Sequence, residues 1–418
     1  MDVTDFGITA DGVKDQTANI QDYLDGVSEN GGGTAFLPAG QYEIKGNLKI
    51  PPGVMLSGSW KAPHHGILNK GTVLKAHANR GSEDRPPFIQ LNEASGVEGI
   101  TILYPEQVLS EIVAYPWTIQ GRGMHVTLRN ITLVNSYNGI AMGPAHNELH
   151  LIRNIFGCVL RRGIFIDNTT DIGRIENVHF NPHYWARSGH EGAFIKDADP
   201  SVNKDLNVGA VMQRNLEAFI FGRTDWEYVL NTFVFGPRVG YKFIKTPHGM
   251  CNGQFTGIGS DASQYCVLVE DTQGPGLLIT NGEFVCINLQ EEPINLIGVV
   301  TKPTFEGSLQ LTNSAFWGKF HQFMKIEGSG YVSVSQANMQ GNEWKEKLPA
   351  IDVQGGRVVI RDVFFKDYGP HVKIGENVIN AIVTGNSADG GIYIINKAGE
   401  KAQVFANEEQ TVDDGSDL

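Results

Sequence analysis

The chain has 418 residues, 50 of them glycine, with 9% aromatic and 19% charged residues, which is typical of an ordered, turn-rich protein rather than a disordered one. Its formal net charge of -13 argues against a nucleic-acid partner, because phosphate neutralisation requires clustered lysine and arginine. No apolar run approaches the roughly 20 residues of a membrane span, so we expect no membrane partner. The N-terminus MDVTDFG lacks signal-peptide features. We therefore expect a cytosolic protein or, as we favour, the mature form of a secreted or periplasmic one.

The cysteines are spaced too widely to suggest a metal site. Cys158, Cys251, Cys266 and Cys286 form no CxxC pair, so zinc is not expected. Free cysteine behaves as a small apolar residue, and we predict that all four are buried thiols.

Residues 1–60 are expected to form an N-terminal cap with one short amphipathic helix. Ile20, Leu24 and Val27 recur at helical spacing, and the glycines at 31–33 end the helix. The following segment, TAFLPAGQYEIKGNLKIPPGVMLSGSW, is typical of short strands separated by Pro-Ala-Gly and Pro-Pro-Gly turns.

From about residue 95 the sequence repeats with a period near 23 residues. One position of the repeat is polar throughout the series Asn130, Asn154, Asn177, Asn231, Asn281, Asn313, Gln336 and Asp362. In the repeat between Asn231 and Asn281, we assign this position to Asn252. Each repeat also holds a second short apolar strand. This pattern predicts an all-β fold, a single right-handed parallel β-helix of about ten coils, with the polar residues stacked as a structural ladder. The coils are expected over 61–396, and a terminal cap with an acidic, disordered tail over 397–418.

The N-terminal segment resembles the cap of the pectate lyase and polygalacturonase-like superfamily. The matching residues run from DFG, DG and DQT, through the glycines at 31–33, to Pro38, Gly40, Tyr42, Leu56 and Gly58. The resemblance covers about 55 residues and implies a parallel β-helix that acts on or binds carbohydrate. The catalytic motifs of polygalacturonase-like hydrolases are absent: the corresponding turns read Ser136-Tyr137-Asn138, Leu160-Arg161-Arg162 and Leu216-Glu217. Pectate lyases use an arginine base, for which Arg161, Arg162 and Arg223 are available, but no clear acidic triad accompanies them.

One coil is stretched by an insertion from about 183 to 214. Long loops in compact folds are usually functional, and Tyr184, Trp185 and Arg187 suit the wall of a sugar subsite. The alternative is a loop that only covers the sheet.

No cofactor is expected, although the insertion offers ligands for Ca²⁺. Asp197, Asp199 and Asp205 would supply carboxylate oxygens. His179 and His183 lie in HFNPH, where Pro182 forbids the helix of an HExxH-type zinc site.

Strand alternation predicts a groove on the second apolar strand of each coil. If the pairs Ile140/Met142, Ile164/Ile166, Phe219/Phe221, Tyr241/Phe243 and Val267/Val269 point inward, the groove floor carries Asp167, Lys242 and Glu270. Asp167 and Glu270 would be three coils, roughly 14 Å, apart. That exceeds the about 5–9.5 Å of a paired-carboxylate glycosidase, whereas Asp167 and Glu217 are possible partners.

The segment RTDWE at 223–227 is the strongest candidate for chemistry. Asp225 and Glu227 would share one side of a strand at about 6.8 Å. Arg223 would bind an anionic sugar substituent, and Trp226 would stack on a sugar ring. The alternative is a solvated turn with Trp226 packed under the insertion.

We therefore expect a glycoside hydrolase that cleaves a polysaccharide or oligosaccharide by general acid–base catalysis. The catalytic carboxylates are Asp225 and Glu227, or Asp167 and Glu217. Substrate contacts come from Arg223, Trp226, Tyr184, Trp185, Arg187, Lys242, Arg162 and Glu270. A polysaccharide lyase with Arg223 or Lys242 as base is the second possibility. A non-catalytic, tailspike-like glycan-binding module, possibly homo-oligomeric, is the third.

Overall fold

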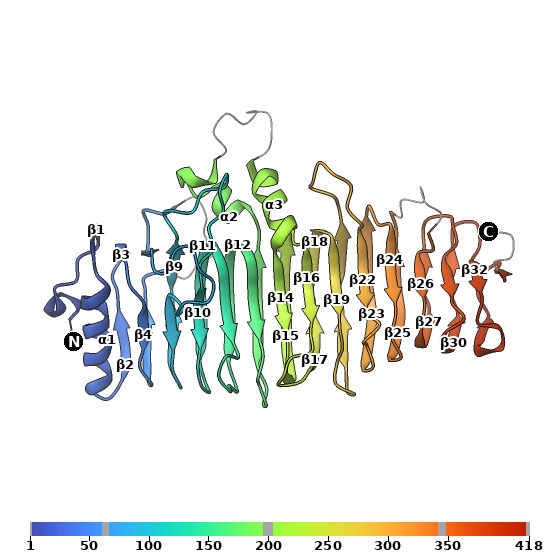
Figure 1. Cartoon of the computed structure of the whole chain (residues 1–418), viewed down its shortest axis with the longest axis horizontal. Helices are drawn as coiled ribbons and strands as arrows, with labels where there is room; N and C mark the ends of the chain where they lie inside the picture. The colour runs from blue at the N-terminus through green and yellow to red at the C-terminus, as the bar shows by residue number, and fades with distance from the viewer. Residues whose placement is uncertain (1, 61–66, 195–203, 342–347, 415–418) are drawn as a thin grey trace. The chain divides into compact units, whose positions relative to one another are not determined.

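The computed structural model describes the chain except residues 1, 61–66, 195–203, 342–347 and 415–418. The described chain divides into unit 1, residues 1–220, and unit 2, residues 221–418 (Figure 1). In each unit short parallel strands stack coil upon coil into three faces, which we call A, B and C. The predicted all-β parallel β-helix is therefore confirmed. In the described part of the chain, no helix is long and apolar enough to cross a membrane.

Unit 1 begins with η1 (Val3–Phe6) and α1 (Thr17–Glu29), which buries Ile20, Tyr23, Leu24 and Val27 as predicted. Face A begins with β1 (Asp11–Asp15), β3 (Gly40–Ile44), β6 (Thr72–Ala76) and β9 (Ile100–Leu103). Face B holds β4 (Leu48–Ile50), β7 (Ile89–Leu91), β10 (Trp117–Gly121) and β14 (Glu217–Phe221). Face C begins with β2 (Gly33–Phe36), β5 (Val54–Ser57) and β8 (Gly96–Glu98).

Three long strands pass from one face of unit 1 to the next: β11 (Thr127–Met142), β12 (Leu151–Ile166) and β13 (Arg174–Phe180). Each starts in face C and turns into face A. β11 and β12 continue into face B without an intervening loop, with Ile140 beside Ile164. The coils of β11 and β12 are therefore the most compact corners between faces A and B.

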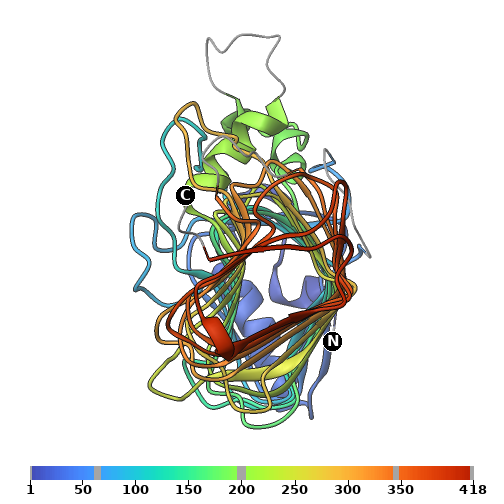
Figure 2. The same ribbon diagram turned by 90° about the vertical axis from the view of Figure 1, so that its right-hand side faces the viewer.

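Unit 2 repeats the arrangement, and Figure 2 superimposes its coils so that the three faces appear as edges. β15 (Thr224–Phe235), β23 (Ser308–Gly318) and β25 (Tyr331–Met339) pass from face C to face A. The other strands of face A are β18 (Gly259–Ser263), β21 (Glu283–Cys286), β28 (Phe364–Phe365) and β31 (Ser387–Ala388). The other strands of face C are β17 (Cys251–Thr256), β20 (Leu277–Thr280), β27 (Gly356–Arg361), β30 (Val378–Thr384) and β33 (Ala402–Phe405).

Face B of unit 2 runs through β16 (Val239–Phe243), β19 (Tyr265–Val269), β22 (Ile297–Thr301), β24 (Gln322–Ile326), β26 (Ile351–Val353), β29 (Val372–Ile374), β32 (Tyr393–Asn396) and β34 (Thr411–Asp413). The last turn of helix is η4 (Gly399–Lys401). Residues 397–414, expected as a cap and acidic tail, thus add two paired strands to the stack.

The core is apolar, and every residue predicted to point inward from face B is fully buried. All four cysteines are buried and free, which confirms that prediction. The residues predicted to point inward from these face B strands therefore form part of the core in both units.

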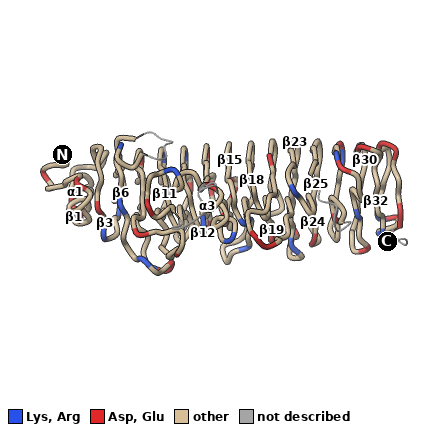
Figure 3. The backbone as a smooth tube through the Cα atoms, turned by 90° about the horizontal axis from the view of Figure 1, so that it is seen from above, with Lys and Arg blue, Asp and Glu red and all other residues tan. Residues whose placement is uncertain are grey.

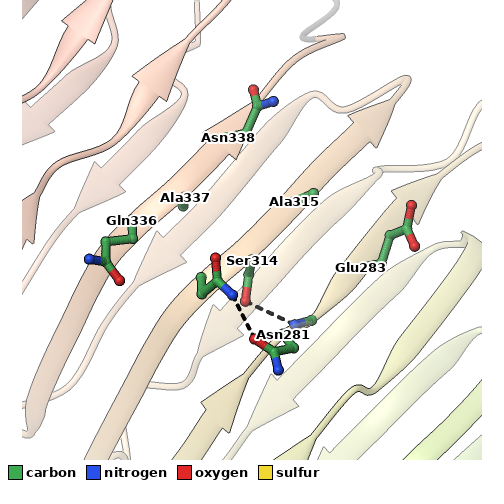
Figure 4. Close-up of a pocket in the computed structure, with 9 residues that line it drawn as sticks. Asn281, Glu283, Ser314, Ala315, Gln336, Ala337 and Asn338 are labelled. Atoms are coloured by element: carbon green, nitrogen blue, oxygen red, sulfur yellow. Dashed lines mark hydrogen bonds between the residues drawn. The ribbon is translucent and has the colours of Figure 1, made fainter.

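The predicted ladder marks the corner between faces C and A. All eight assigned positions have positive φ, from 49° at Asn313 to 56° at Asn130 and Asn281. In unit 1 the Asn154 amide donates to Asn130 at 2.9 Å and accepts from Asn177 at 2.8 Å. In unit 2 Asn313 donates to Asn281 at 2.6 Å (Figure 4). The repeated residue is thus selected by a left-handed backbone, which asparagine tolerates.

The assignment of Asn252 to this ladder is wrong. The position between Asn231 and Asn281 is held by Gly257, which has a φ of 63° and follows Thr256, the partner of Thr280. Glycine satisfies the same backbone requirement without an amide. Asn252 instead accepts a hydrogen bond from the Trp226 backbone and donates to Gln273.

The insertion contains α2 (His183–Ala186), η2 (Glu191–Ala193) and α3 (Lys204–Asn215), shown beside β11 and β12 in Figure 1. Helix α2 starts directly after Pro182, because proline is compatible with the first turn of a helix but not with its interior. The insertion is therefore largely folded where the structure describes it.

Candidate functional site

The expected centre at 223–227 has a different geometry from the prediction. β15 bulges between Thr224, the partner of Cys251, and Glu227, the partner of Gly253. Trp226 occupies the extra position with a φ of 62°, so strand alternation is broken between the two carboxylates. The Glu227 side chain is completely buried, whereas Trp226 is 56% exposed. The expected same-side pair of Asp225 and Glu227 is therefore not formed.

Asp225 is engaged in a polar network on the surface of unit 2. Its carboxylate accepts hydrogen bonds from Arg223 at 2.5 Å and from the Gln273 amide at 2.7 Å. Gln273 also donates to the backbone oxygens of Thr224 and Met250. These contacts hold the bulged strand against β17, which is a structural role.

The second expected pair, Asp167 and Glu217, is separated by the length of a strand. A Cβ on Gly163 would lie 2.2 Å from the Ala218 oxygen, so Ala218 lies beside Gly163 and Glu217 beside Arg162. Asp167 follows Arg162 by five residues, roughly 16 Å of extended chain. In unit 2, the half-buried Lys242 lies on β16, and the half-buried Glu270 directly follows the neighbouring strand β19.

The aromatic residues of the insertion are packed inward. Tyr184 is 3% and Trp185 0% exposed, so neither can form the expected sugar subsite wall. Trp185 Nε1 donates to His190 Nδ1 at 3.1 Å, which leaves His190 Nε2 to donate to the Pro105 carbonyl at 3.1 Å. These bonds attach the insertion to the connection after β9.

The exposed Arg187 of the insertion forms an ion pair with Asp205, whose Oδ2 accepts from Nε at 3.0 Å. This pairing occupies one of the three carboxylates considered for Ca²⁺, and Asp197 and Asp199 lie outside the described residues. Among the residues that the structure places, no three His, Cys, Asp or Glu side chains could hold a metal ion.

The structure brings together polar side chains at the corner between faces A and B of unit 1. The connections at this corner are long after β6 (residues 77–88), β9 (104–116) and β13 (181–216), but β11 and β12 turn directly. Long connections therefore frame the two compact corners, which carry Tyr137, Asn138, Arg161 and Arg162. We call this region the corner site.

Glu83, from the connection after β6, is the centre of the corner site. Its carboxylate forms an ion pair with Arg162 and accepts hydrogen bonds from Asn138 Nδ2 at 3.1 Å and the Tyr137 hydroxyl at 3.2 Å. Arg162 Nε also donates to Asn138 Oδ1 at 3.0 Å. A single carboxylate is thus oriented by three side chains from two neighbouring coils, with 28% of it exposed.

An aromatic platform lies next to this carboxylate. The Arg162 guanidinium sits 4.8 Å from the centre of the Trp117 ring, in a cation–π contact. Trp117 stacks with Phe165, with ring centres 6.1 Å apart and planes inclined by 17°. The small Ala141 lies between Gln120 and Phe165 in the strand register. The corner site therefore pairs flat apolar rings with an oriented ion pair.

The protonation states of two groups follow from this packing. Burial raises the pKa of Glu83, but hydrogen bonds from Asn138, Arg162 and Tyr137 outweigh burial and hold the net pKa below its ordinary value. Burial, reinforced by Glu83, raises the pKa of the Tyr137 hydroxyl. At neutral pH the site therefore presents an ionised carboxylate next to a protonated phenol.

A second acidic residue extends the site along the connection after β9. Glu106 is contacted by Arg80 Nε at 3.4 Å, His77 Nδ1 at 3.5 Å and the Tyr115 hydroxyl at 3.5 Å. The Tyr115 carbonyl accepts from Asn138, which links this group to Glu83. Of the predicted site residues, Arg162 and Glu217 are the two that lie at the corner site.

Sequence reasoning missed Glu83, Trp117 and Phe165 as site residues. Glu83 lies 79 residues from its partner Arg162, so no local motif joins them. The available signal was the pair of turns at Tyr137-Asn138 and Arg161-Arg162, where two coils lack a loop between their strands.

Unit 2 has a separate shallow hollow of about 550 Å³ on the outside of its ladder (Figure 4). Asn281, Asn313 and Ser314 line it, and they already hydrogen-bond to neighbouring coils. Glu283, also in the lining, accepts from Trp317 Nε1 at 3.1 Å. The lining is thus mainly the exposed side of a structural ladder.

Comparison with known proteins agrees with this architecture. Residues 1–84 match a family model described as rhamnogalacturonase A/epimerase, pectate lyase-like. The N-terminal segment is pectate lyase-like. The resemblance seen in the sequence is thereby confirmed for the segment that carried it.

Two curated relatives that match a short segment of this chain come from Azotobacter vinelandii. Mannuronan C5-epimerase AlgE1 is 51% identical over 53 residues, which are 13% of this chain and 4% of the epimerase. Alginate lyase 7 is 39% identical over 54 residues, which are 13% of this chain and 6% of the lyase. The chain therefore aligns with less than a tenth of either relative.

A solved structure resembles the chain over nearly its whole length. The N-terminal fragment of bacteriophage phi29 gene product 12 has a TM-score of 0.69 and 15% identity, covering 97% of this chain and 70% of the fragment. At this identity the likeness concerns the fold alone. It supports the parallel β-helix beyond the pectate lyase-like N-terminal segment.

Proposed function

We propose that the pectate lyase-like chain is a carbohydrate-active enzyme that hydrolyses an acidic polysaccharide at the corner site of unit 1. The observation that carries the proposal is the Glu83 carboxylate, held by Arg162, Asn138 and Tyr137 beside the stacked Trp117 and Phe165 rings. Flat rings pack against the apolar faces of sugar rings, and an oriented carboxylate supports general acid–base chemistry.

The residues divide between chemistry and binding. Glu83, ionised at neutral pH, acts as the general base that activates water. Glu217 supplies the second carboxyl group, because it lies beside Arg162 and about one strand spacing, roughly 4.8 Å, further along the stack. Carboxylates on either side of Arg162 suit the spacing of about 5–9.5 Å used by glycosidases. Trp117 and Phe165 form the sugar platform.

Arg161 favours an acidic substrate. Its side chain is half-buried, and its hydrogen bond to the Asn215 carbonyl is long, 3.4 Å from Nη1, so the guanidinium remains able to bind a uronate carboxylate. The relatives named for mannuronan and alginate agree with a polyuronate, although they share only a short segment with this chain.

Elimination is the second candidate reaction. It needs cations that neutralise a uronate carboxylate and a group that removes a proton, and Arg161, Arg162 and Tyr137 lie together. Elimination leaves an unsaturated uronate, which absorbs ultraviolet light, whereas hydrolysis does not.

The test uses the purified chain with polygalacturonate, rhamnogalacturonan, polymannuronate and a neutral β-glucan. New reducing ends without ultraviolet absorbance support hydrolysis, and absorbance supports elimination. Glu83→Gln should lower turnover by about 10²-fold or more. Glu98→Gln is the matched control, because Glu98 pairs with Arg129 at 2.5 Å on face C of the same unit.

The same assay compares the two predicted sites. Unchanged turnover in Glu83→Gln, with loss in Asp225→Asn or Glu227→Gln, would refute the corner site and favour the bulged strand. Binding without turnover on every polymer would favour the non-catalytic glycan-binding module.

A further inference from the structure

Part of the outward surface of face C in unit 2, before Arg357 and Arg361 of β27, lacks the charges that this face carries in unit 1. In unit 1 it carries ion pairs across neighbouring strands, Arg129 with Glu98 at 2.5 Å and Arg153 with Glu176 at 3.5 Å. Charged residues of both signs occur along both units (Figure 3). In unit 2, however, the outward positions of β17, β20, β23 and β25 on face C carry no charged residue.

Two rows of side chains make up this surface, which we call the neutral strip. The strand register aligns each row across four strands: Gln254, Leu278, Gln310 and Ser333; Thr256, Thr280, Thr312 and Ser335. Every side chain in the two rows except Leu278 is an uncharged polar group that can both donate and accept hydrogen bonds. Ser335 donates to Thr312 at 3.1 Å across the strip.

Large apolar side chains are exposed at one end of the neutral strip. Trp226 is 56%, Leu230 41% and Leu278 41% exposed. The bulge in β15 places Trp226 outward, because the extra residue shifts the side-chain alternation. Grouped exposure of this kind usually marks a binding surface.

Two hollows follow the strip and share Leu278. One of about 150 Å³ lies between Trp226, Gln254, Pro275 and Leu278. The other, about 230 Å³, is lined by Thr280, Gln310, Thr312 and Ser333 among others. The hollows therefore extend from the indole across β17, β20, β23 and β25 to β27, where Arg361 lines the second hollow.

We propose that the neutral strip binds an uncharged glycan chain, with Trp226 stacking on a terminal sugar ring. A neutral chain matches these four strands, whose outward side chains include no ionised group that would lose water on binding, and meets a charge only at Arg361 on the edge of the second hollow. Sugar hydroxyls donate and accept, as do the threonine, serine and glutamine side chains. An acidic polymer would find no counter-charge on these four strands. The strip uses none of the corner-site residues, so this binding does not depend on the proposed hydrolysis.

The binding test is affinity electrophoresis in gels that contain hydroxyethylcellulose, laminarin, galactomannan or dextran, with polygalacturonate as the acidic comparison. We expect at least one neutral polymer to retard the protein. Trp226→Ala should weaken that retardation about tenfold or more, since an aromatic anchor dominates such a contact. Trp226→Phe should retain most of it.

Trp317→Ala is the matched control, because Trp317 is 40% exposed but belongs to face A. It should bind as the wild type does. Thermal unfolding of each variant separates lost binding from lost folding. Glu83→Gln is run in the same gels, so that failure of binding and failure of turnover are measured independently.

Three outcomes would overturn the proposal. These are no retardation of the folded protein by any neutral polymer, equal retardation of wild type and Trp226→Ala, or stronger retardation by polygalacturonate through the strip. Sedimentation velocity tests whether a second copy of the chain occupies the strip instead. A dimer that Trp226→Ala converts to monomer would assign the strip to that second copy.

Discussion

Replacing Asn154 separates the two contributions of a ladder residue, its hydrogen bonds and its backbone conformation. The Asn154 amide makes two hydrogen bonds, at 2.9 and 2.8 Å, which together contribute about 1–3 kcal/mol to the free energy of unfolding. Its φ is 55°, where an alanine costs roughly a further 1–2 kcal/mol. Asn154→Ala should therefore destabilise the chain by about 2–5 kcal/mol.

Asn154→Gly provides the decisive comparison. Glycine loses the same two hydrogen bonds but adopts a positive φ without strain, so it should be less destabilising than alanine. At the adjacent Arg153, in ordinary strand conformation and 57% exposed, the order should reverse because glycine costs roughly 0.5–1 kcal/mol more than alanine. Equilibrium urea unfolding followed by circular dichroism measures all four variants. An alanine at 154 as stable as glycine would refute the argument that the backbone selects asparagine.

Three further predictions concern ionisable groups. The folded-state pKa of Glu83 is depressed, so its contribution to stability is present above the ordinary pKa of 4.5 and is lost as pH falls through the lower folded-state pKa. The difference in melting temperature between wild type and Glu83→Gln should therefore shrink as pH falls below 4.5. Burial lowers the pKa of His190, so the insertion should be most stable above pH 6.5 and become less stable as pH falls below it. Protease cleavage within the insertion should show this pH dependence in the wild type but not in His190→Gln. Burial raises the pKa of the Cys158 and Cys251 thiols, so a thiol reagent should modify no cysteine in the native protein and all four after unfolding; rapid native labelling would contradict the packed core.

The fold was predictable because its constraints repeat. Alternating apolar residues, short strands and a residue in the left-handed conformation, in most coils a polar one, recur along the stack, so each coil supports the interpretation of the others. The error at Asn252 has the same origin. The repeated requirement is a positive φ, which Gly257 meets although it carries no amide side chain.

The site was less predictable because the repeat makes distant residues neighbours. Sequence spacing favours Asp225 and Glu227, which are close in the chain, but one extra residue at Trp226 turns them apart and buries Glu227. A bulge changes side-chain direction without leaving a clear sign in the sequence.

In a stacked coil, groups for chemistry collect most readily where the repeat is interrupted. The inward positions of each coil are committed to the core and the corner positions between faces C and A to the ladder, whereas the connections between faces A and B vary from none in β11 and β12 to the whole segment 181–216. A long connection can fold over a neighbouring compact corner, as the segment with Glu83 does over Arg162. Catalytic geometry then depends on the order of long and short connections along the stack, so residues 79 positions apart can form one site.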